Sequence, residues 1–436
     1  MENKVKVIGA GLAGVEAAIY LADHGIKVKL YDIKPNKFTP AHKSQNFAEL
    51  VCSNSLKSND VYGNACGLLK EEMRLLGSTV IKVADSVKVP AGNALAVDRE
   101  KFASLLTEKV KSNKNIEFYS EEIEDINFDE YTIIATGPLT TEKLSKTISK
   151  IVGDGLSFYD ASAPIIAFDS IDMENAFIGD RYDKGNGDHL NLPMNKEEYT
   201  LFIEELLSAK RAELHGFESS SVFEGCMPVE VMATRGKDTL RFGPLKPAGL
   251  TDPKTGRWPY ACVQLRREDQ TGTMYNMVGF QTNLLFPEQK RVFGIIPALR
   301  NAEFLRYGVM HRNTFINSTK VLNKNYSLKS HPKTFFAGQI TGVEGYVESA
   351  GSGLMTAIYL TGILQGKPVR DIDECTVLGA LAKYITTENK DFQPMNANFG
   401  ILPPPNAMIR DKALKKKAQA ERSLGAIIDF KKEIEQ

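Results

Sequence analysis

The sequence carries no excess of charge of either sign. Lysine and arginine total 54, aspartate and glutamate also total 54, and the formal net charge is therefore zero. Overall charge does not indicate a nucleic-acid partner, so RNA could bind only at a local basic patch. Apolar residues make up 42% of the 436 and charged residues 25%, which is typical of a globular chain. A chain of this length can bury a core for two or more domains.

Cysteine is scarce, with five residues scattered along the chain and no pair at C-x-x-C spacing. This pattern argues against a disulfide framework, a zinc site and thioredoxin-type chemistry, and we expect no bound metal. Long apolar runs are missing as well, since no stretch approaches the roughly 18 residues that a membrane span needs. The residues after Met1 do not resemble a signal peptide. We expect a cytoplasmic protein with no membrane partner.

A glycine-rich turn opens the chain between a short apolar strand and a helix. It reads Gly9-Ala10-Gly11-Leu12-Ala13-Gly14, the G-x-G-x-x-G pattern of dinucleotide-binding folds. In that pattern Gly9 allows the tight turn, Gly11 lets the backbone approach a pyrophosphate, and Gly14 lets helix and strand pack closely. Asp32 ends the second strand, where a carboxylate can accept hydrogen bonds from the adenosine ribose. A glycine-rich turn without a ligand is the alternative.

Later segments repeat the apolar-strand pattern and end in small residues. Ile133–Ala135 leads into Thr136-Gly137, and Phe335–Ala337 leads into Gly338-Gln339. Both turns resemble those of the glutathione-reductase-like flavoproteins, although the commonest version has aspartate where this chain has Gln339. They favour FAD over NAD as the resident cofactor. The elements expected for this domain are strands at Val5–Ile8, Lys27–Tyr31, Tyr131–Ala135 and Thr334–Ala337 and helices at Val15–His24 and Gly351–Leu364.

The middle of the chain has a different sequence pattern. Ile165–Phe168 and Met274–Phe280 are typical of strands, and Lys196–Ala212 is typical of a helix. The fold class predicted from these patterns is α/β, a Rossmann-like FAD-binding domain of glutathione-reductase type with an inserted mixed α/β domain. We expect residues 1–157 to form the first part of the FAD-binding domain, 158–299 the inserted domain, and 300–436 the second part with a charged helical tail.

Two cysteines lie in segments where a reactive thiol would be useful. Cys52 follows an apolar run and precedes small polar residues, and Cys226 lies between Gly225 and Pro228 in a turn. Each could equally be an inert core residue. His42 and His311 could be general bases or hydrogen-bonded loop residues.

Basic residues gather after Cys226. A run of this kind is usually a solvated face, but beside a candidate nucleophile it could contact RNA phosphates. The residues singled out are Arg235, Lys237, Arg241 and Lys246, joined by Arg257, Arg266 and Arg267.

Several longer strings resemble one family of enzymes through nearly the whole chain. They are Phe47–Ser55, Phe223–Glu230, Phe242-Gly243-Pro244, Arg306–Ser318, Phe335–Ser349 and Gln393–Gly400. These strings resemble the TrmFO family, the bacterial methylenetetrahydrofolate–tRNA (uracil-5-)-methyltransferases that use folate and FAD. The flavin-binding strands also resemble the related GidA-type tRNA modifiers. Within the Phe335–Ser349 string, Gly338, Gln339, Gly342 and Tyr346 are the expected cofactor contacts.

The resemblance implies a specific chemistry. 5,10-Methylenetetrahydrofolate would supply the carbon, NAD(P)H would reduce FAD, and reduced FAD would carry the methylene group and reduce it to methyl. Cys226 would be the nucleophile that adds to uracil C6, and Cys52 a second reactive thiol, either a base or a protector of the flavin adduct. The favoured substrate is uridine 54 of the tRNA T-loop, with no obligatory protein partner.

One departure from the family pattern puts the choice of RNA in doubt. The family usually has His-His-Thr-Asp before the Phe-Ala-Glu-Leu string, whereas this chain has His42-Lys43-Ser44-Gln45-Asn46. Related mycoplasma-type proteins modify ribosomal RNA, so the resemblance also implies a uridine of 23S rRNA as an alternative substrate. Alternatives of other classes are a flavin-dependent disulfide reductase, a GidA-like modifier that needs a partner, and a flavin-bound RNA-binding protein without turnover.

Overall fold

The first strand lies at the centre of a parallel sheet. The computed structural model describes residues 4–39, 41–153, 156–183, 187–212, 227–389, 392–405 and 408–435. Five strands follow the order β16-β7-β1-β2-β6, and every pairing is parallel. They are β1 (Lys4–Ile8), β2 (Lys27–Asp32), β6 (Ile116–Ser120), β7 (Tyr131–Ile134) and β16 (Thr334–Phe336). The prediction of a parallel α/β sheet is confirmed.

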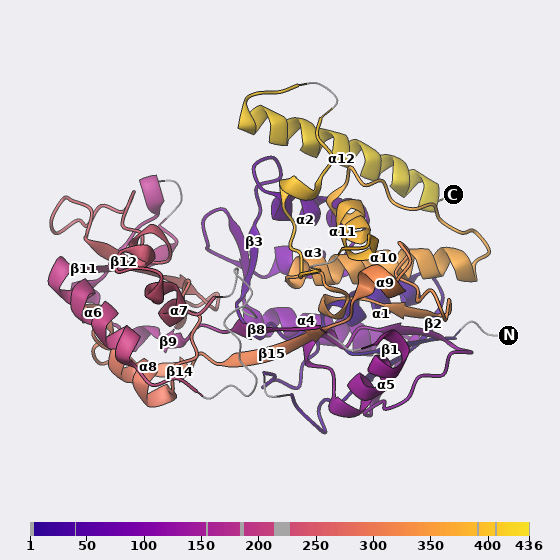
Figure 1. Cartoon of the computed structure of the whole chain (residues 1–436), viewed down its shortest axis with the longest axis horizontal. Helices are drawn as coiled ribbons and strands as arrows, with labels where there is room; N and C mark the ends of the chain where they lie inside the picture. The colour runs from indigo at the N-terminus through magenta and orange to yellow at the C-terminus, as the bar shows by residue number, and fades with distance from the viewer. Residues whose placement is uncertain are drawn as a thin grey trace.

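Two glycine-containing helices, α1 (Leu12–Asp23) and α10 (Tyr346–Leu364), pack against each other beside this sheet (Figure 1). Both begin earlier than predicted, because Gly14 and Gly351 lie inside the helices and not at their starts. A Cβ on Gly353 would come within 2.3 Å of the Ala13 carbonyl oxygen. The same lobe contains α2 (Ala65–Leu75), α3 (Thr79–Ser86), α4 (Arg99–Ser112), α5 (Glu142–Val152), α9 (Ser318–Val321), α11 (Val377–Thr386) and the tail helix α12 (Lys412–Ile434). A small antiparallel sheet is formed by β3 (Ser55–Ser58), β5 (Ala94–Val97) and β4 (Lys88–Val89).

The second lobe is built on a six-stranded antiparallel sheet of order β10-β11-β12-β13-β9-β14. Its strands are β10 (Phe177–Ile178), β11 (His189–Met194), β12 (Ala261–Arg267), β13 (Met274–Met277), β9 (Ile165–Ala167) and β14 (Phe304–Arg306). Helices α6 (Lys196–Ser208), α7 (Val229–Thr234) and α8 (Phe286–Phe293) belong to this lobe. The helix predicted to reach Ala212 ends at Ser208. The domain limits 158–299 stay a prediction, and β14 adds residues beyond 299 to this sheet.

The lobes are joined by a two-stranded ribbon of β8 (Leu156–Ala161) and β15 (Met310–Phe315), and Figure 1 shows β15 running from one lobe to the other. Side chains also connect them. The Asn54 amide donates to the carbonyl of Arg267 at 2.8 Å, and Arg99 pairs with Glu268 at 2.9 Å. These contacts place the segment before β3 directly against the end of β12.

Two fully buried glutamates hold the starts of other helices in the first lobe. Glu16 accepts hydrogen bonds from the backbone N–H groups of Thr79 and Val80 at 2.9 and 2.7 Å. Glu72 accepts from Val377 and Leu378 at 2.7 and 2.9 Å. A carboxylate at a helix N-terminus satisfies N–H groups that have no partner within the helix. Burial nevertheless raises the pKa of both glutamates to about 7.

We expect the protein to lose stability between pH 4.5 and about pH 7 through these two groups. Their ordinary pKa is 4.5, so the folded chain holds the protons more tightly than the unfolded chain. The stabilisation is complete below pH 4.5 and is lost as the pH rises through about 7. The expected change is about 3 kcal/mol for each glutamate. Urea unfolding at pH 5 and pH 8 measures it. In Glu72→Gln the dependence should be shallower, and an unchanged slope would contradict the assignment.

Candidate cofactor and active site

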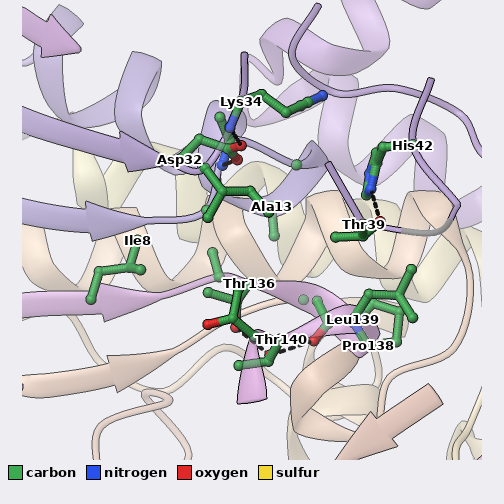
Figure 2. Close-up of a pocket in the computed structure, with 18 of the residues that line it drawn as sticks. Ile8, Ala13, Asp32, Lys34, Thr39, His42, Thr136, Pro138, Leu139 and Thr140 are labelled. Carbon is green, nitrogen blue, oxygen red and sulfur yellow. Dashed lines mark hydrogen bonds between the residues drawn. The ribbon is translucent and has the colours of Figure 1, made fainter. Parts of the chain in front are cut away.

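A pocket opens where the strands β1, β2, β7 and β16 end at their carboxyl edge. It encloses about 1130 Å³ of empty space, including open solvent. Ligands of parallel α/β sheets bind at this edge. Of the predicted cofactor residues, those lining the pocket are Gly9, Ala10, Gly11, Leu12, Ala13, Asp32, Thr136, Gly137, Gly338, Gln339 and Tyr346. Figure 2 shows that Asp32 and Ala13 face Thr136 across it.

The glycines of the opening turn have three different surroundings. Gly9 has a φ of +103°, and a Cβ there would lie 2.5 Å from the Ala135 carbonyl oxygen. A Cβ on Gly14 would lie 1.8 Å from the carbonyl oxygen of Gly9, so this glycine shapes the turn without lining the pocket. A Cβ on Gly11 would meet no protein atom within 4 Å. Gly11 is also the N-cap of α1 and has no side-chain cap, which leaves the helix N-terminus facing the pocket. That arrangement fits a pyrophosphate.

Asp32 is fixed beside this turn. Its carboxylate accepts hydrogen bonds from the backbone N–H of Ala10 at 2.7 Å and of Lys34 at 2.9 Å. The same carboxylate lines the pocket, where its remaining acceptor capacity suits a ribose hydroxyl. The predicted contact is therefore geometrically available.

The later predicted cofactor residues divide into two groups. In the first group, Gly137 and Gly338 have φ values of +65° and +83°, so both turns need glycine. Gln339, in the same group, donates a hydrogen bond through its side-chain amide to Glu344. Gly342 does not line the pocket. Its φ is +90°, and a Cβ there would lie 2.4 Å from the ring of Phe392, so it shapes the chain before α10.

The candidate base His42 lies at one side of the pocket. The sequence did not single out its polar neighbours there, which are Lys34, Thr39 and Glu49. His42 Nδ1 lies 2.6 Å from the Thr39 hydroxyl (Figure 2). Burial, followed by the charge of Lys34, lowers the pKa of His42, which favours a neutral imidazole. Glu49 accepts from the backbone N–H of Lys43 at 2.9 Å, so it orders the loop that departs from the family pattern. No motif spacing in the sequence predicts this cluster, because the residues come together only through the conformation of the loop.

Cys52 lies in a loop that arginines hold from two sides. The Cys52 backbone N–H donates to the Tyr346 hydroxyl at 2.7 Å, and the Cys52 thiol lies 3.6 Å from the Ala161 carbonyl oxygen. Arg306 donates to the carbonyl of Val51 at 2.7 Å, and Arg99 donates to the carbonyl of Leu50. Tyr346 also lines the pocket, so the loop and the pocket share a wall.

Arg266 completes this support from β12. It donates to the Ser53 hydroxyl at 2.8 Å and to the Asn54 side-chain oxygen at 3.1 Å. The sequence placed Arg266 in a basic run that could meet RNA, but only 8% of the residue is exposed. This interpretation was wrong for Arg266, because alternation along β12 turns it toward the first lobe while Arg267 faces Tyr275.

Arg266→Met should impair methyl transfer while FAD binding is retained. Removing both hydrogen bonds frees the Cys52 loop, and misplacing a reactive group by about 1 Å can cost about 100-fold in rate. Arg267→Met on the opposite face of the same strand is the matched control and should change the rate less than about two-fold. Turnover and bound-flavin absorbance of both variants measure this. Equal rates for the two would contradict a positioning role for Arg266.

The remaining predicted residues lie elsewhere or outside the described part of the chain. Cys226 lies outside the described residues, which resume at Met227. Arg235, Lys237 and Lys246 are exposed on the second lobe, and Arg241 is half-buried there. The side chain of His311 is likewise outside the description. Burial raises the pKa of Cys66, Cys262 and Cys375 to about 12, so these thiols stay protonated near neutral pH.

The described residues contain neither a candidate membrane span nor a candidate metal site. None of the helices described is both long enough and apolar enough to span a membrane. Among the same residues, no three His, Cys, Asp or Glu side chains gather in an arrangement that could hold a metal ion.

Comparison with known proteins identifies the family of this chain. The family model described as GIDA, Glucose inhibited division protein A, matches residues 4–368. A TrmFO methylenetetrahydrofolate–tRNA-(uracil-5-)-methyltransferase of Acetivibrio thermocellus is 57% identical over 432 residues, covering 99% of both chains. This chain belongs to the TrmFO family. A TrmFO protein of Staphylococcus aureus strain JH9 is 55% identical over 435 residues, covering 99% of this chain and 100% of its own.

Solved structures support the fold of this TrmFO family member. The chain superposes on Aquifex aeolicus GidA, form II crystal, with a TM-score of 0.72 at 14% identity, covering 99% of this chain and 73% of that one. The form I crystal of the same GidA gives a TM-score of 0.70 at 15% identity, covering 100% of this chain and 78% of that one. At this identity the likeness shows the fold alone, and it confirms the predicted Rossmann-like class.

Proposed function

We propose that this chain is an RNA (uracil-5-)-methyltransferase that makes 5-methyluridine in tRNA, with uridine 54 of the T-loop as its target. The observation that carries the proposal is a glycine-turn pocket beside the Cys52 loop, in a chain 57% identical to a TrmFO relative along its whole length. The proposed one-carbon donor is 5,10-methylenetetrahydrofolate, because the TrmFO relative is a methylenetetrahydrofolate-dependent enzyme by name.

FAD is the cofactor of this family, and the pocket residues fit it. The open space at Gly11 and the uncapped start of α1 suit a pyrophosphate, and Asp32 suits the adenosine ribose. When bound and reduced by NAD(P)H, FAD would carry the methylene group and supply the two electrons that turn it into methyl. Asp32 bears on the resident dinucleotide and not on the transient reductant.

The side chains of this protein have separate tasks in the proposed reaction. The Cys226 thiolate adds to uracil C6 and forms a C–S bond, which makes C5 nucleophilic. The carbon unit would then pass to C5 as its bond to the carrier breaks, a base would take the C5 proton, and a hydride from the reduced cofactor would complete the methyl group as the C–S bond breaks. Cys52, held between Tyr346 and the arginines, is the proposed second thiol, either as that base or as a guard of the flavin.

Exposed cations on the second lobe support RNA as the substrate. Arg235, Lys237 and Lys246 lie close in sequence to Cys226 and are proposed to contact phosphates, with Arg241 beside them. The cytoplasm is the proposed compartment, and no obligatory protein partner is proposed.

Tritium release from C5-labelled uridine RNA tests the activity directly. Purified protein with FAD, NADPH and methylenetetrahydrofolate should release tritium from an unmodified tRNA transcript, and nuclease digestion with mass spectrometry should place 5-methyluridine in the T-loop. A 23S rRNA transcript run in parallel tests the alternative substrate that the Lys43–Asn46 departure raises. Release from neither RNA would refute the proposed function.

A further inference from the structure

An almost fully exposed phenylalanine projects from the second lobe. Phe242 is 83% exposed and ends the short 3-10 turn η7 (Thr239–Phe242). The turn is anchored beneath it, because Leu240 and Leu245 are fully buried and the Leu245 N–H donates to the Leu240 carbonyl at 2.9 Å. The backbone that carries Phe242 is thus fixed while its ring lies in solvent.

The neighbouring arginine adds to this support. Arg241 donates to the carbonyl of Tyr260 at 2.9 Å and pairs with Asp238 at 2.8 Å. Its guanidinium also lies 3.7 Å from the centre of the Tyr260 ring, a cation–π contact. Arg241 is therefore held back against the lobe, and Phe242 is the side chain that the turn presents outward.

The surface around Phe242 is strongly basic although the whole chain is neutral. Between residues 235 and 260 there are six basic residues and two acidic ones. Of the acidic pair, Asp238 is bound to Arg241 and Asp252 is 9% exposed. Lys237, Lys246 and Arg257 are exposed, and within the described residues none of these three forms an ion pair. A partner of negative charge fits this face.

The chain connectivity ties this surface to the segment that carries Cys226. Helix α7 begins at Val229, whose N–H donates to the Gln281 carbonyl at 2.7 Å, and packs against η7. Val229 is three residues beyond Cys226 in the sequence. A ligand that contacts the Phe242 turn therefore binds to the packed pair of α7 and η7, and α7 begins three residues after Cys226.

We propose that Phe242 is a stacking platform for an unpaired base of the RNA substrate, with Lys237 and Lys246 at the flanking phosphates. This inference rests on the proposed function and names a contact surface for it. Proteins recognise single-stranded RNA by stacking splayed bases on rigid aromatic rings beside cations. A uridine that reacts at C5 and C6 must leave its stack, and its neighbours then need a new surface.

Binding of unmodified tRNA to the FAD-loaded enzyme tests the platform. Phe242→Ala should weaken binding about 5- to 150-fold, since base stacking on an aromatic ring contributes about 1–3 kcal/mol. Phe242→Tyr should bind within about two-fold of the unchanged protein, because the ring is kept. Phe286→Ala removes another exposed aromatic, 50% exposed on α8, and should have no effect. Bound flavin and circular dichroism show that each variant is folded.

Salt dependence separates stacking from charge. The slope of log affinity against log salt should be unchanged in Phe242→Ala, because no phosphate contact is lost. In Lys246→Ala the slope should fall by about one. A reduced slope in Phe242→Ala would overturn the stacking role.

The single tryptophan of the chain allows a direct measurement. In the double variant Phe242→Trp with Trp258→Phe, tRNA should quench the only indole emission, whereas methylenetetrahydrofolate alone should not. Quenching by methylenetetrahydrofolate alone would indicate that the aromatic ring at position 242 contacts the pteridine of the folate and not an RNA base. That result would overturn the proposal. Absent quenching together with unchanged affinity in Phe242→Ala would also overturn it. If the unchanged enzyme neither binds tRNA nor releases tritium, the proposed function fails as well, so the two failures are distinguishable.

Discussion

Gly14→Ala is expected to give a colourless protein that does not retain FAD. A Cβ at this position would come within 1.8 Å of the Gly9 carbonyl oxygen, a backbone atom that cannot move without opening the turn. Overpacking of this kind typically costs about 1–3 kcal/mol in stability, and here the displaced turn is also the proposed pyrophosphate site. Flavin absorbance of the purified protein and titration with FAD measure the effect.

Two other glycines sharpen this test. Gly11→Ala places its methyl group in open space, so the fold should be unchanged while FAD affinity falls about 10- to 100-fold from a clash with the cofactor itself. Gly425→Ala, inside α12 and equally without close neighbours, should keep the flavin and gain up to about 1 kcal/mol in stability. If Gly11→Ala and Gly425→Ala bind FAD alike, the pyrophosphate does not lie at this turn.

Cys226→Ala is expected to abolish 5-methyluridine formation, a loss of at least about 1000-fold. Without addition at C6, the uracil C5 carbon is too weak a nucleophile to accept the one-carbon unit. Tritium release from C5 should therefore vanish, and binding of FAD should not change. Absorbance and tritium release on the same preparation provide both measurements.

Cys52→Ala is the informative companion variant. If Cys52 is the base, Cys52→Ala should still form a covalent complex between Cys226 and 5-fluorouridine RNA, seen as a shifted band under denaturing conditions. Cys226→Ala should give no such band. A covalent complex that persists in Cys226→Ala and disappears in Cys52→Ala would exchange the two roles.

The fold was more accessible from the sequence than the site. Residues 4–32 predicted the central strands because apolar runs, glycine spacing and the closing acid all agree locally. The starts of α1 and α10 were predicted too late, since Gly14 and Gly351 interrupt a helical pattern in the sequence but lie inside the helices, where a side chain would meet close neighbours. Their place depends on segments distant in the chain.

The pocket shows the same division. Its glycine turns and Asp32 could be predicted because each follows a strand at a fixed spacing. The group around His42 and the arginines around Cys52 could not, because they come from separate elements that only the folded chain brings together. Arg266 was placed in the wrong surroundings for the same reason, since its pairing partners lie more than 200 residues earlier in the sequence.

The arginine support of the Cys52 loop has a consequence for any attempt to study half of the molecule. Cys52 belongs to the lobe with the parallel sheet, but Arg266 and Arg306 come from strands of the other lobe. A truncated protein that keeps only the flavin-binding lobe would retain the contacts of Tyr346 and Arg99 with this loop but lose those of Arg266 and Arg306. Reactivity measured on such a fragment would describe a cysteine whose loop has lost half of its arginine contacts or more, and not the cysteine of the enzyme.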